Sequence, residues 1–268
     1  MIKIGIVGCA GRMGQMLVRE VLDTEGVALS GGTGRAGGDA IGRDLGELVG
    51  RSRVGVAIGT DPKTLFECSD AVIDFTSPAA TVEHAALAAE TRTVHVIGTT
   101  GLTSDQEALL RERATRTAVV WAPNMSVGVN LLFSLVEQVA RALDPATYDI
   151  EIVEMHHRHK VDAPSGTALG LGRAAAAGRG VVLSDVWQKT RDGVTGARPM
   201  GEIGFATLRG GDVVGDHTVV FAADGERIEL THKASSRQVF AKGAVRAARW
   251  GHGKPPGLYS MQDVLGLI

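Results

Sequence analysis

The sequence has few cysteines, few aromatic side chains and no long hydrophobic run. Its 268 residues include two cysteines, Cys9 and Cys68. Two thiols in a chain of this length exclude a disulfide framework and favour a reducing compartment. The apolar run that opens the chain stops at Gly8, which makes it too short for a signal peptide or a membrane span, and no later run is long enough either. We therefore expect a cytoplasmic protein without a membrane partner.

An excess of charge of either sign is also missing. The formal net charge is −2, and acidic and basic residues are mixed along the chain. No basic stripe indicates a nucleic-acid partner, and no polybasic segment indicates a lipid surface. Glycine, in contrast, is abundant, with 36 residues, and much of it lies in short loops between apolar runs. Nucleotide-binding α/β proteins require such loops.

The first half of the chain alternates between strand-like and helix-like segments. The apolar runs that predict strands are residues 2–7, 27–30, 71–75, 93–97 and 118–121. The segments with helical spacing are residues 13–22, 78–89 and 104–113, the last with Ser104 and Glu107 as a capping box. This alternation predicts a Rossmann-type parallel sheet with helices on both faces.

The pattern changes near Asn124. A helix is predicted over residues 129–143, strands over 148–155 and 201–208, and a hairpin from 218–222 and 227–232. A last helix over 239–250 returns to the first domain. We expect an α/β fold with a dinucleotide-binding domain formed by residues 1–126 and 238–268. A second α+β domain with a mixed sheet, residues 127–237, would bind the substrate and form the oligomer.

A glycine-rich loop follows the first predicted strand with the spacing GxxGxxG, from Gly8 to Gly14. Such glycines let the turn close and let backbone amides approach a pyrophosphate at the N-terminus of the next helix. A purely structural turn is the alternative, but the strand before the loop and the helix after it favour dinucleotide binding. The loop residues expected to bind the cofactor are Gly8, Cys9, Ala10, Gly11, Arg12 and Met13.

Polar and glycine residues also follow three other predicted strands. Asp74, Phe75 and Thr76 end one strand, and two further segments follow the next two. The carboxyl ends of parallel strands line the ligand crevice, although a simple strand-to-helix turn is an alternative for each. The residues expected to complete the cofactor site are Gly98, Thr99, Thr100, Ala122, Pro123, Asn124 and Met125.

The segment EMHHRHKVDAPSGT, residues 154–167, concentrates three of the eight histidines and a lysine. Histidine supplies a proton near neutral pH, and lysine supplies one or holds a carboxylate. The segment ends at a helix start whose free amides bind anions. It therefore predicts an acid–base and anion site rather than a solvated loop. A metal site is the rival, since His157 and His159 share a face if the strand continues, but Arg158 and Lys160 would repel a cation, and we expect no metal.

Taken together, VGCAGRMG, DFT, GTTG, APNMSVGVN and EMHHRHKVDAPSGTAL resemble the 4-hydroxy-tetrahydrodipicolinate reductase family, also called dihydrodipicolinate reductase. The resemblance covers nearly the whole chain. It implies an oxidoreductase of lysine and diaminopimelate biosynthesis that uses NAD(P)H to reduce a cyclic dicarboxylate with loss of water, and that forms a homotetramer. It also implies a role for each residue of the histidine-rich segment: His156 as proton donor, Lys160 as its acidic partner, and His157, Lys160, Gly166 and Thr167 as ligands of the substrate carboxylates.

The chain departs from the family pattern just past the second strand. Members often have an acidic residue there to bind the adenine ribose, whereas this chain has Gly34 followed by Arg35. We expect Arg35 to bind a 2′-phosphate, so that NADPH is preferred and NADH is still used. Two other functions share the first domain: a non-catalytic NAD(P) sensor, and an amino acid or hydroxy acid dehydrogenase. Neither accounts for the histidine-rich segment.

Overall fold

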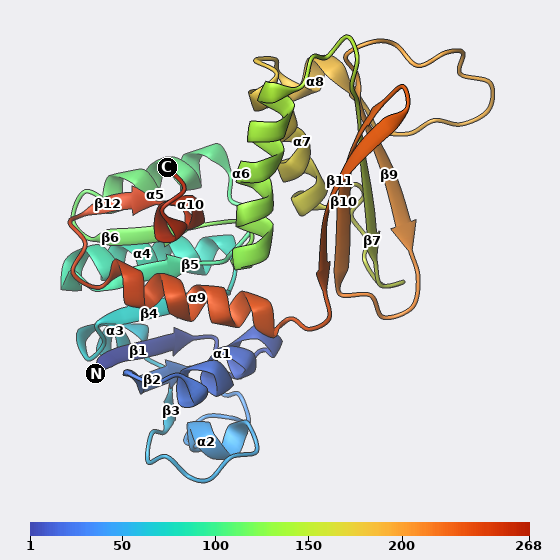
Figure 1. Cartoon of the computed structure of the whole chain (residues 1–268). Coiled ribbons are helices and arrows are strands. Elements are labelled where there is room, and N and C mark those ends of the chain that lie inside the picture. The colour runs from blue at the N-terminus through green and yellow to red at the C-terminus, as the bar shows by residue number, and fades with distance from the viewer. The chain divides into compact units, whose positions relative to one another are not determined.

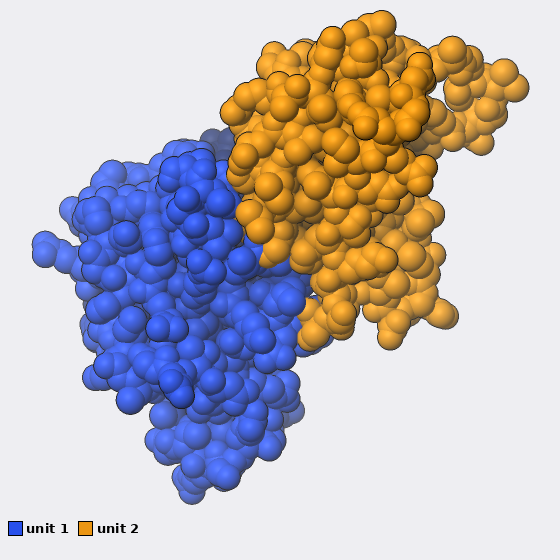
Figure 2. Space-filling model, viewed as in Figure 1, with its two compact units in different colours: residues 1–127, 237–268 blue, residues 128–236 orange.

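The computed structural model describes residues 1–268 and divides them into two compact units (Figure 2). Unit 1 consists of residues 1–127 and 237–268, and unit 2 of residues 128–236. The chain leaves unit 1 after its sixth strand and returns to it for the last strand and the last two helices. Unit 2 is therefore an insertion in unit 1.

Unit 1 contains a seven-stranded parallel sheet in the order β12-β6-β5-β4-β1-β2-β3. Its strands are β1 (Ile2–Val7), β2 (Val27–Thr33), β3 (Ile58–Gly59), β4 (Ala71–Asp74), β5 (Val94–Ile97), β6 (Ala118–Trp121) and β12 (Gly257–Tyr259). From β1 the chain first builds outward through β2 and β3, and then crosses to β4 on the other side. The order thus reverses between β1 and β4, which is where open parallel sheets bind ligands.

Helices cover both faces of this sheet. They are α1 (Arg12–Asp23), α2 (Leu45–Leu48), α3 (Pro62–Glu67), α4 (Pro78–Thr91), α5 (Ser104–Arg113), α9 (Gln238–Gly251) and α10 (Met261–Leu265). Helices α1 and α9 pack side by side on one face, where Leu17 and Ala244 join Ile4 and Ile6 in a fully buried core (Figure 1). Helices α3, α4 and α5 cover the other face in two separate clusters, in which Phe66 and Leu110 are fully buried. Burying this apolar surface is the main stabilisation of the sheet.

Unit 2 contains a five-stranded mixed sheet in the order β11-β10-β7-β9-β8. Its elements are α6 (Val127–Ala142, beginning at the last residue of unit 1), β7 (Asp149–His156), α7 (Gly166–Gly178), α8 (Leu183–Val186), β8 (Trp187–Gln188), β9 (Ile203–Arg209), β10 (Gly215–Ala223) and β11 (Glu226–Ala234). Strand β10 is antiparallel to β7 and β11, whereas β9 is parallel to β7 and β8. Helices α6 and α7 pack against one face, around Ile152 and Phe221.

The predicted fold class is confirmed, and the predicted strands and long helices lie within a few residues of the observed ones. The predicted capping box is wrong by one position. Helix α5 begins at Ser104, so its N-cap is Thr103, and the box is formed with Gln106 rather than Glu107. None of the helices combines the length and the hydrophobicity that crossing a membrane requires.

Candidate active site

A cavity of about 710 Å³ lies in unit 1 at the carboxyl ends of β1, β2 and β4. Of the predicted cofactor residues, Gly8, Ala10, Gly11 and Arg35 line it, and Gly34 does as well. This is the edge at which the strand order reverses. Its volume is in the range of small-molecule and cofactor sites.

The glycine loop is shaped by one left-handed backbone conformation and one close approach of its own backbone. Gly8 has a φ of +68°, in the left-handed region that favours glycine. A Cβ on Gly14 would lie 2.3 Å from the carbonyl oxygen of Gly8, so only glycine lets the loop fold back over the first turn of α1. Gly11 is the N-cap of α1 and has no side chain to bind the free amides there. Those amides and the helix dipole suit a pyrophosphate.

Three other predicted residues of this loop do not line the cavity. The Cys9 thiol is fully buried in the core, where a Cβ on Gly32 would lie 2.8 Å from its sulfur. Burial raises the pKa of this thiol to about 11, so it stays protonated and unreactive. Arg12 is exposed and Met13 is half-buried at the start of α1. A role of Cys9 in binding is therefore limited to its backbone.

The remaining predicted cofactor residues follow β5 and β6, beyond β4 in the sheet. Gly98 lies against the ring of Phe75, where a Cβ would be 2.2 Å from the nearest ring carbon, and Thr99 is buried. Thr100 and Pro123 are exposed, whereas Ala122 and Met125 are buried. The Asn124 side chain accepts a hydrogen bond from the Ser126 amide at 2.8 Å, which shapes the turn after β6.

A buried hydrogen-bond network that the sequence analysis did not predict lies beneath the cavity. Asp74, at the end of β4, is fully buried. Its Oδ2 binds His84 Nδ1 at 2.8 Å and His95 Nε2 at 3.3 Å, and its Oδ1 accepts from the amide and hydroxyl of Thr76 at 3.0 and 2.6 Å. Burial raises the pKa of Asp74, but the bonds from His84 and His95 outweigh it and lower this pKa far below its usual value. The Asp74 carboxylate thus fixes Thr76, which lines the cavity.

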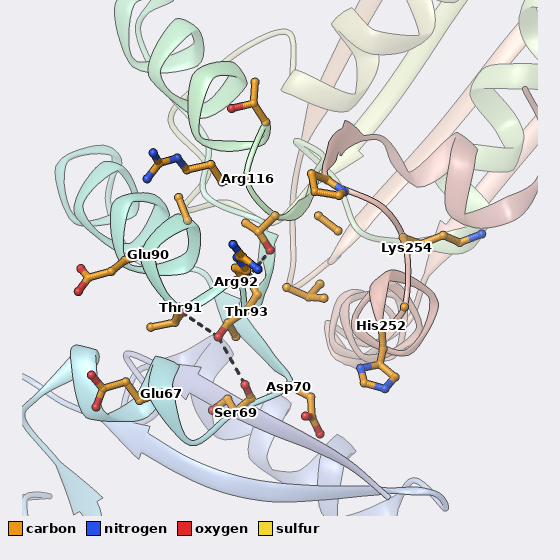
Figure 3. Close-up of a pocket in the computed structure, with 17 residues that line it drawn as sticks. Glu67, Ser69, Asp70, Glu90, Thr91, Arg92, Thr93, Arg116, His252 and Lys254 are labelled. Carbon is orange, nitrogen blue, oxygen red and sulfur yellow. Dashed lines mark hydrogen bonds between the residues drawn. The ribbon is translucent and has the colours of Figure 1, made fainter.

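A larger cavity, about 940 Å³, lies at the opposite edge of the same sheet (Figure 3). Residues that precede β4, β5 and β6 line it, among them Asp70, Thr93 and Thr117. Arg92, Arg116 and Lys254 contribute positive charge, and Glu67 and Glu90 contribute negative charge. Ligands of parallel sheets bind at the carboxyl edge, so the smaller cavity is the candidate cofactor site.

In unit 2, His156 occupies the last position of β7 and is 9% exposed. Its Nδ1 lies 2.6 Å from Oε2 of Glu154, which is two residues earlier on the same face of the strand. The ring of His217 meets it edge-on, with ring centroids 5.1 Å apart. Burial lowers the pKa of His217 to about 4, and the electrostatic effect of the neighbouring His156 ring acts in the same direction. His217 is therefore neutral near pH 7.

The predicted substrate residues follow directly. The amide of His157 donates to the carbonyl of Val213 at 2.7 Å, and Lys160 Nζ binds both carboxylate oxygens of Asp162 at 2.7 and 2.9 Å. The hydrogen bond from Lys160 is the largest cause of the lowered pKa of Asp162. The sequence analysis did not identify Asp162 as a partner of Lys160.

Helix α7 begins in the same segment, with Ser165 as its N-cap. The Ser165 hydroxyl accepts from the Ala168 amide at 3.1 Å. Gly166 and Thr167 are the first two residues of this helix, and no acidic residue lies in its first turn. Its positive N-terminus is therefore suited to a carboxylate.

The condition for a metal site at the histidines is not met. Strand β7 ends at His156, so His157 and His159 do not share a strand face, and their ring centroids are 6.2 Å apart. No group of three or more His, Cys, Asp or Glu side chains is arranged to hold a metal ion.

Unit 1 has the sheet order, the glycine loop and the cavity of an NAD(P)-binding Rossmann domain, and unit 2 carries a buried acid–base cluster beside a helix N-terminus. These features define the chain as a nicotinamide-dependent oxidoreductase. Two family models match it: "Dihydrodipicolinate reductase, N-terminus" over residues 2–125 and "Dihydrodipicolinate reductase, C-terminus" over residues 128–265. The chain therefore belongs to the dihydrodipicolinate reductase family.

Similar proteins cover almost the whole chain. A 4-hydroxy-tetrahydrodipicolinate reductase of Ruegeria pomeroyi is 60% identical over 264 residues, 98% of this chain and 98% of the relative. One of Parvibaculum lavamentivorans is 59% identical over 267 residues, 99% and 98% of the two chains. Among solved structures, a dipicolinate-bound dihydrodipicolinate reductase from Paenisporosarcina sp. TG-14 is 27% identical, with a TM-score of 0.79 and 98% of both chains covered.

Proposed function

We infer that the chain reduces 4-hydroxy-tetrahydrodipicolinate to tetrahydrodipicolinate with NAD(P)H, a step of lysine and diaminopimelate biosynthesis. Its identity of 60% with a reductase of that name, over nearly the full length of both chains, carries this conclusion. In the balanced reaction, the substrate loses its hydroxyl as water and takes up one hydride and one proton. NAD(P)H, when bound, supplies the hydride, and the protein must supply the proton and hold the dianionic substrate.

We propose that His156 is the proton donor. Hydride uptake at a conjugated carbon of the ring leaves an anion, which a nearby acid must protonate. His156 is the histidine of the cluster that combines burial with a carboxylate partner at 2.6 Å, and that partner stabilises its positively charged form. Lys160 acts as its acidic partner, as the family resemblance implies.

The substrate carboxylates are held by the start of α7 and its neighbours. The amides of Gly166 and Thr167, the Lys160 ammonium and the His157 side chain supply the donors. In the structure Lys160 pairs with Asp162, whose side chain is 55% exposed. A substrate carboxylate can therefore replace Asp162, and the released Asp162 side chain becomes solvated. The Paenisporosarcina reductase was solved with dipicolinate, a planar dicarboxylate, bound to it, which supports a dicarboxylate ligand here.

The cofactor is proposed to occupy the cavity of unit 1. The pyrophosphate lies on the amides of residues 8–13, and the nicotinamide end extends toward residues 98–100 and 122–125. Arg35 and Gly34 line the part of the cavity that follows β2. Because Gly34 supplies no carboxylate to repel a 2′-phosphate and Arg35 supplies a cation, NADPH is preferred and NADH remains usable. Asp39, which also lines this cavity, is the acid available to the ribose of NADH.

Unit 2 is proposed to form a homotetramer as well as to bind the substrate. The sheet face that α7 does not cover has partly exposed apolar side chains on neighbouring strands, namely Val153, Met155, Leu208 and Val220. Such a surface favours association. Light scattering coupled to size-exclusion chromatography measures the mass, and a monomer at assay concentration would contradict the tetramer.

The reaction is tested by following the absorbance of NADPH while a synthase generates the substrate from pyruvate and aspartate semialdehyde. We expect oxidation of NADPH that depends on both the synthase and the enzyme. The matched control omits the synthase and leaves pyruvate and aspartate semialdehyde in place. Oxidation at the same rate in this control would identify a different substrate, and no oxidation with the synthase present would contradict the proposed function.

A further inference from the structure

Glu154 lies behind His156 and has all of its hydrogen-bonding capacity in use. It is 1% exposed. Its Oε2 accepts from His156 Nδ1 at 2.6 Å and from Arg209 Nη1 at 2.8 Å, and its Oε1 accepts from Arg209 Nη2 and the Ser165 amide, both at 3.0 Å. Burial raises the pKa of Glu154, but the bonds from His156, Arg209 and Ser165 outweigh it and lower this pKa to about 2. The Glu154 side chain is therefore a carboxylate at neutral pH.

An ionised carboxylate accepts hydrogen bonds and donates none. At 2.6 Å from Glu154, the Nδ1 atom of His156 must therefore carry a hydrogen, whether the imidazole ring is neutral or charged. The proton that His156 gains and loses is then the one on Nε2. This atom faces Gly215, where the Cβ of any other residue would lie only 3.0 Å from it, so the glycine leaves room beside Nε2.

We propose that Glu154 is a positioning residue that fixes the tautomer of His156, so that Nε2 passes the proton to the substrate. The inference rests on the proposed function, in which His156 is the donor. In the proton transfer, the Nε2–H bond breaks, its electron pair stays on the ring, and the substrate anion gains the hydrogen. His156 then becomes neutral with its hydrogen on Nδ1, and solvent restores the proton on Nε2.

Glu154 also fixes the position of His156, the proposed donor, relative to the N-terminus of α7, the proposed anion site. Its bond to the Ser165 amide fixes the residue that caps α7, whose first amides are proposed to bind a carboxylate. Arg209 shares its guanidinium between Glu154 and the carbonyl of Asp162, at 2.6 Å, which ties the Lys160 loop to the same point. A single buried carboxylate thus connects the proton donor, the helix N-terminus and the lysine loop.

A purely structural buried ion pair makes different predictions from a positioning carboxylate. Glu154 on its own strand and His217 on β10 contact His156, and Arg209 on β9 pairs with Glu154. Lys160 on the following loop and His232 on β11 act electrostatically on His217. Glu154 is the one negative charge among these groups. Removing this charge while keeping the side-chain shape should therefore change the proton step rather than substrate binding.

The kinetic test is Glu154→Gln. We expect kcat to fall by about 10²-fold or more, in the direction seen when the carboxylate behind a catalytic histidine becomes an amide, with a much smaller change in KM. The alkaline limb of the kcat–pH profile should also move to lower pH, because the carboxylate no longer stabilises the imidazolium. The control is Glu151→Gln, the same change on the opposite face of β7, where Arg191 and Arg198 pair with Glu151. A pH profile that shifts equally in both variants, or in neither, would overturn the proposal.

A second measurement tests the tautomer without relying on activity. Nitrogen-15 spectra of histidine-labelled enzyme, with His156 assigned by its loss in His156→Ala, report which ring nitrogen is protonated. We expect Nδ1–H in the wild type at every pH at which the protein is folded, and a population of the Nε2–H tautomer in Glu154→Gln. Neutral His156 with its hydrogen on Nε2 in the wild type would refute the proposal. If Nδ1–H is found but His156→Ala remains fully active, the proposed donor fails and the positioning by Glu154 stands.

Discussion

Replacing Asp74 with Asn tests the buried network beneath the cofactor cavity. The Asp74 carboxylate accepts hydrogen bonds from two imidazoles and from Thr76, all in a fully buried position. An amide of the same shape keeps one acceptor oxygen and places an NH₂ group against the remaining donors. Each buried donor left unsatisfied costs about 1–3 kcal/mol, so the loss of the bonds from two imidazoles together costs about 3–5 kcal/mol. We expect Asp74→Asn to lower the free energy of unfolding by that amount.

For a chain of this size, the loss corresponds to a decrease in Tm of roughly 6–20 °C, at about 2–4 °C per kcal/mol. Calorimetry or urea titration at pH 7 measures it. Asp70→Asn is the matched control: Asp70 immediately precedes β4, is partly exposed and accepts one backbone hydrogen bond at 2.7 Å, from Lys3. We expect the control to cost about 1 kcal/mol. Equal losses in the two variants, or a loss near zero for Asp74→Asn, would refute the reasoning.

The pH dependence of the same comparison follows from the lowered pKa of Asp74. A group whose pKa is lower in the folded than in the unfolded protein stabilises the fold fully at pH values above its unfolded-state pKa. This stabilisation is lost as the pH falls through its folded-state pKa. The usual value for Asp is 3.8. The difference in stability between the wild type and Asp74→Asn should therefore be complete at pH 7 and should decrease below about pH 4. A difference that already decreases between pH 7 and pH 5 would contradict the assignment to Asp74.

Three further predictions concern the ligands. Arg35→Ala should weaken NADPH by about 1.5–3 kcal/mol and barely change NADH, as measured by steady-state kinetics with both cofactors; equal effects on the two would contradict a 2′-phosphate contact. Pyridine-2,6-dicarboxylate should compete with the substrate and the 2-monocarboxylate should bind much more weakly, so similar inhibition constants would exclude a two-carboxylate site. Activity should survive exhaustive treatment with a chelator, and elemental analysis that finds one bound zinc per chain would overturn the acid–base interpretation of the histidines.

Features that one segment carries by itself could be predicted from the sequence. The buried strand Ile2–Val7 is an unbroken apolar run, and the glycine loop after it has its spacing within seven residues. The histidine-rich segment likewise places His156, Lys160 and the start of α7 within a dozen residues. In each case, local geometry alone brings the groups together. The short strands β3, β8 and β12 have only two or three residues, too few for a periodicity to be recognised.

Features that depend on pairing between elements could not be predicted. Asp74, His84 and His95 lie on β4, α4 and β5, and nothing in their spacing shows that they meet. An aspartate inside an otherwise apolar strand was the available signal, because a buried carboxylate requires partners. The cap of α5 was placed one residue late because Thr103 and Ser104 both suit an N-cap, and each has a suitable partner three residues later.

The central claim is that this reductase transfers a proton from His156 to its substrate. It is tested most directly by comparing His156→Ala with His252→Ala. His252 is the control because it lines the cavity at the opposite edge of the unit 1 sheet from the proposed cofactor site. Turnover is measured by NADPH oxidation, and the Kd of NADPH is measured separately by fluorescence. We expect His156→Ala to lose at least about 10²-fold in kcat with little change in NADPH affinity, and His252→Ala to keep wild-type turnover. Near-normal turnover in a folded His156→Ala enzyme would contradict the account.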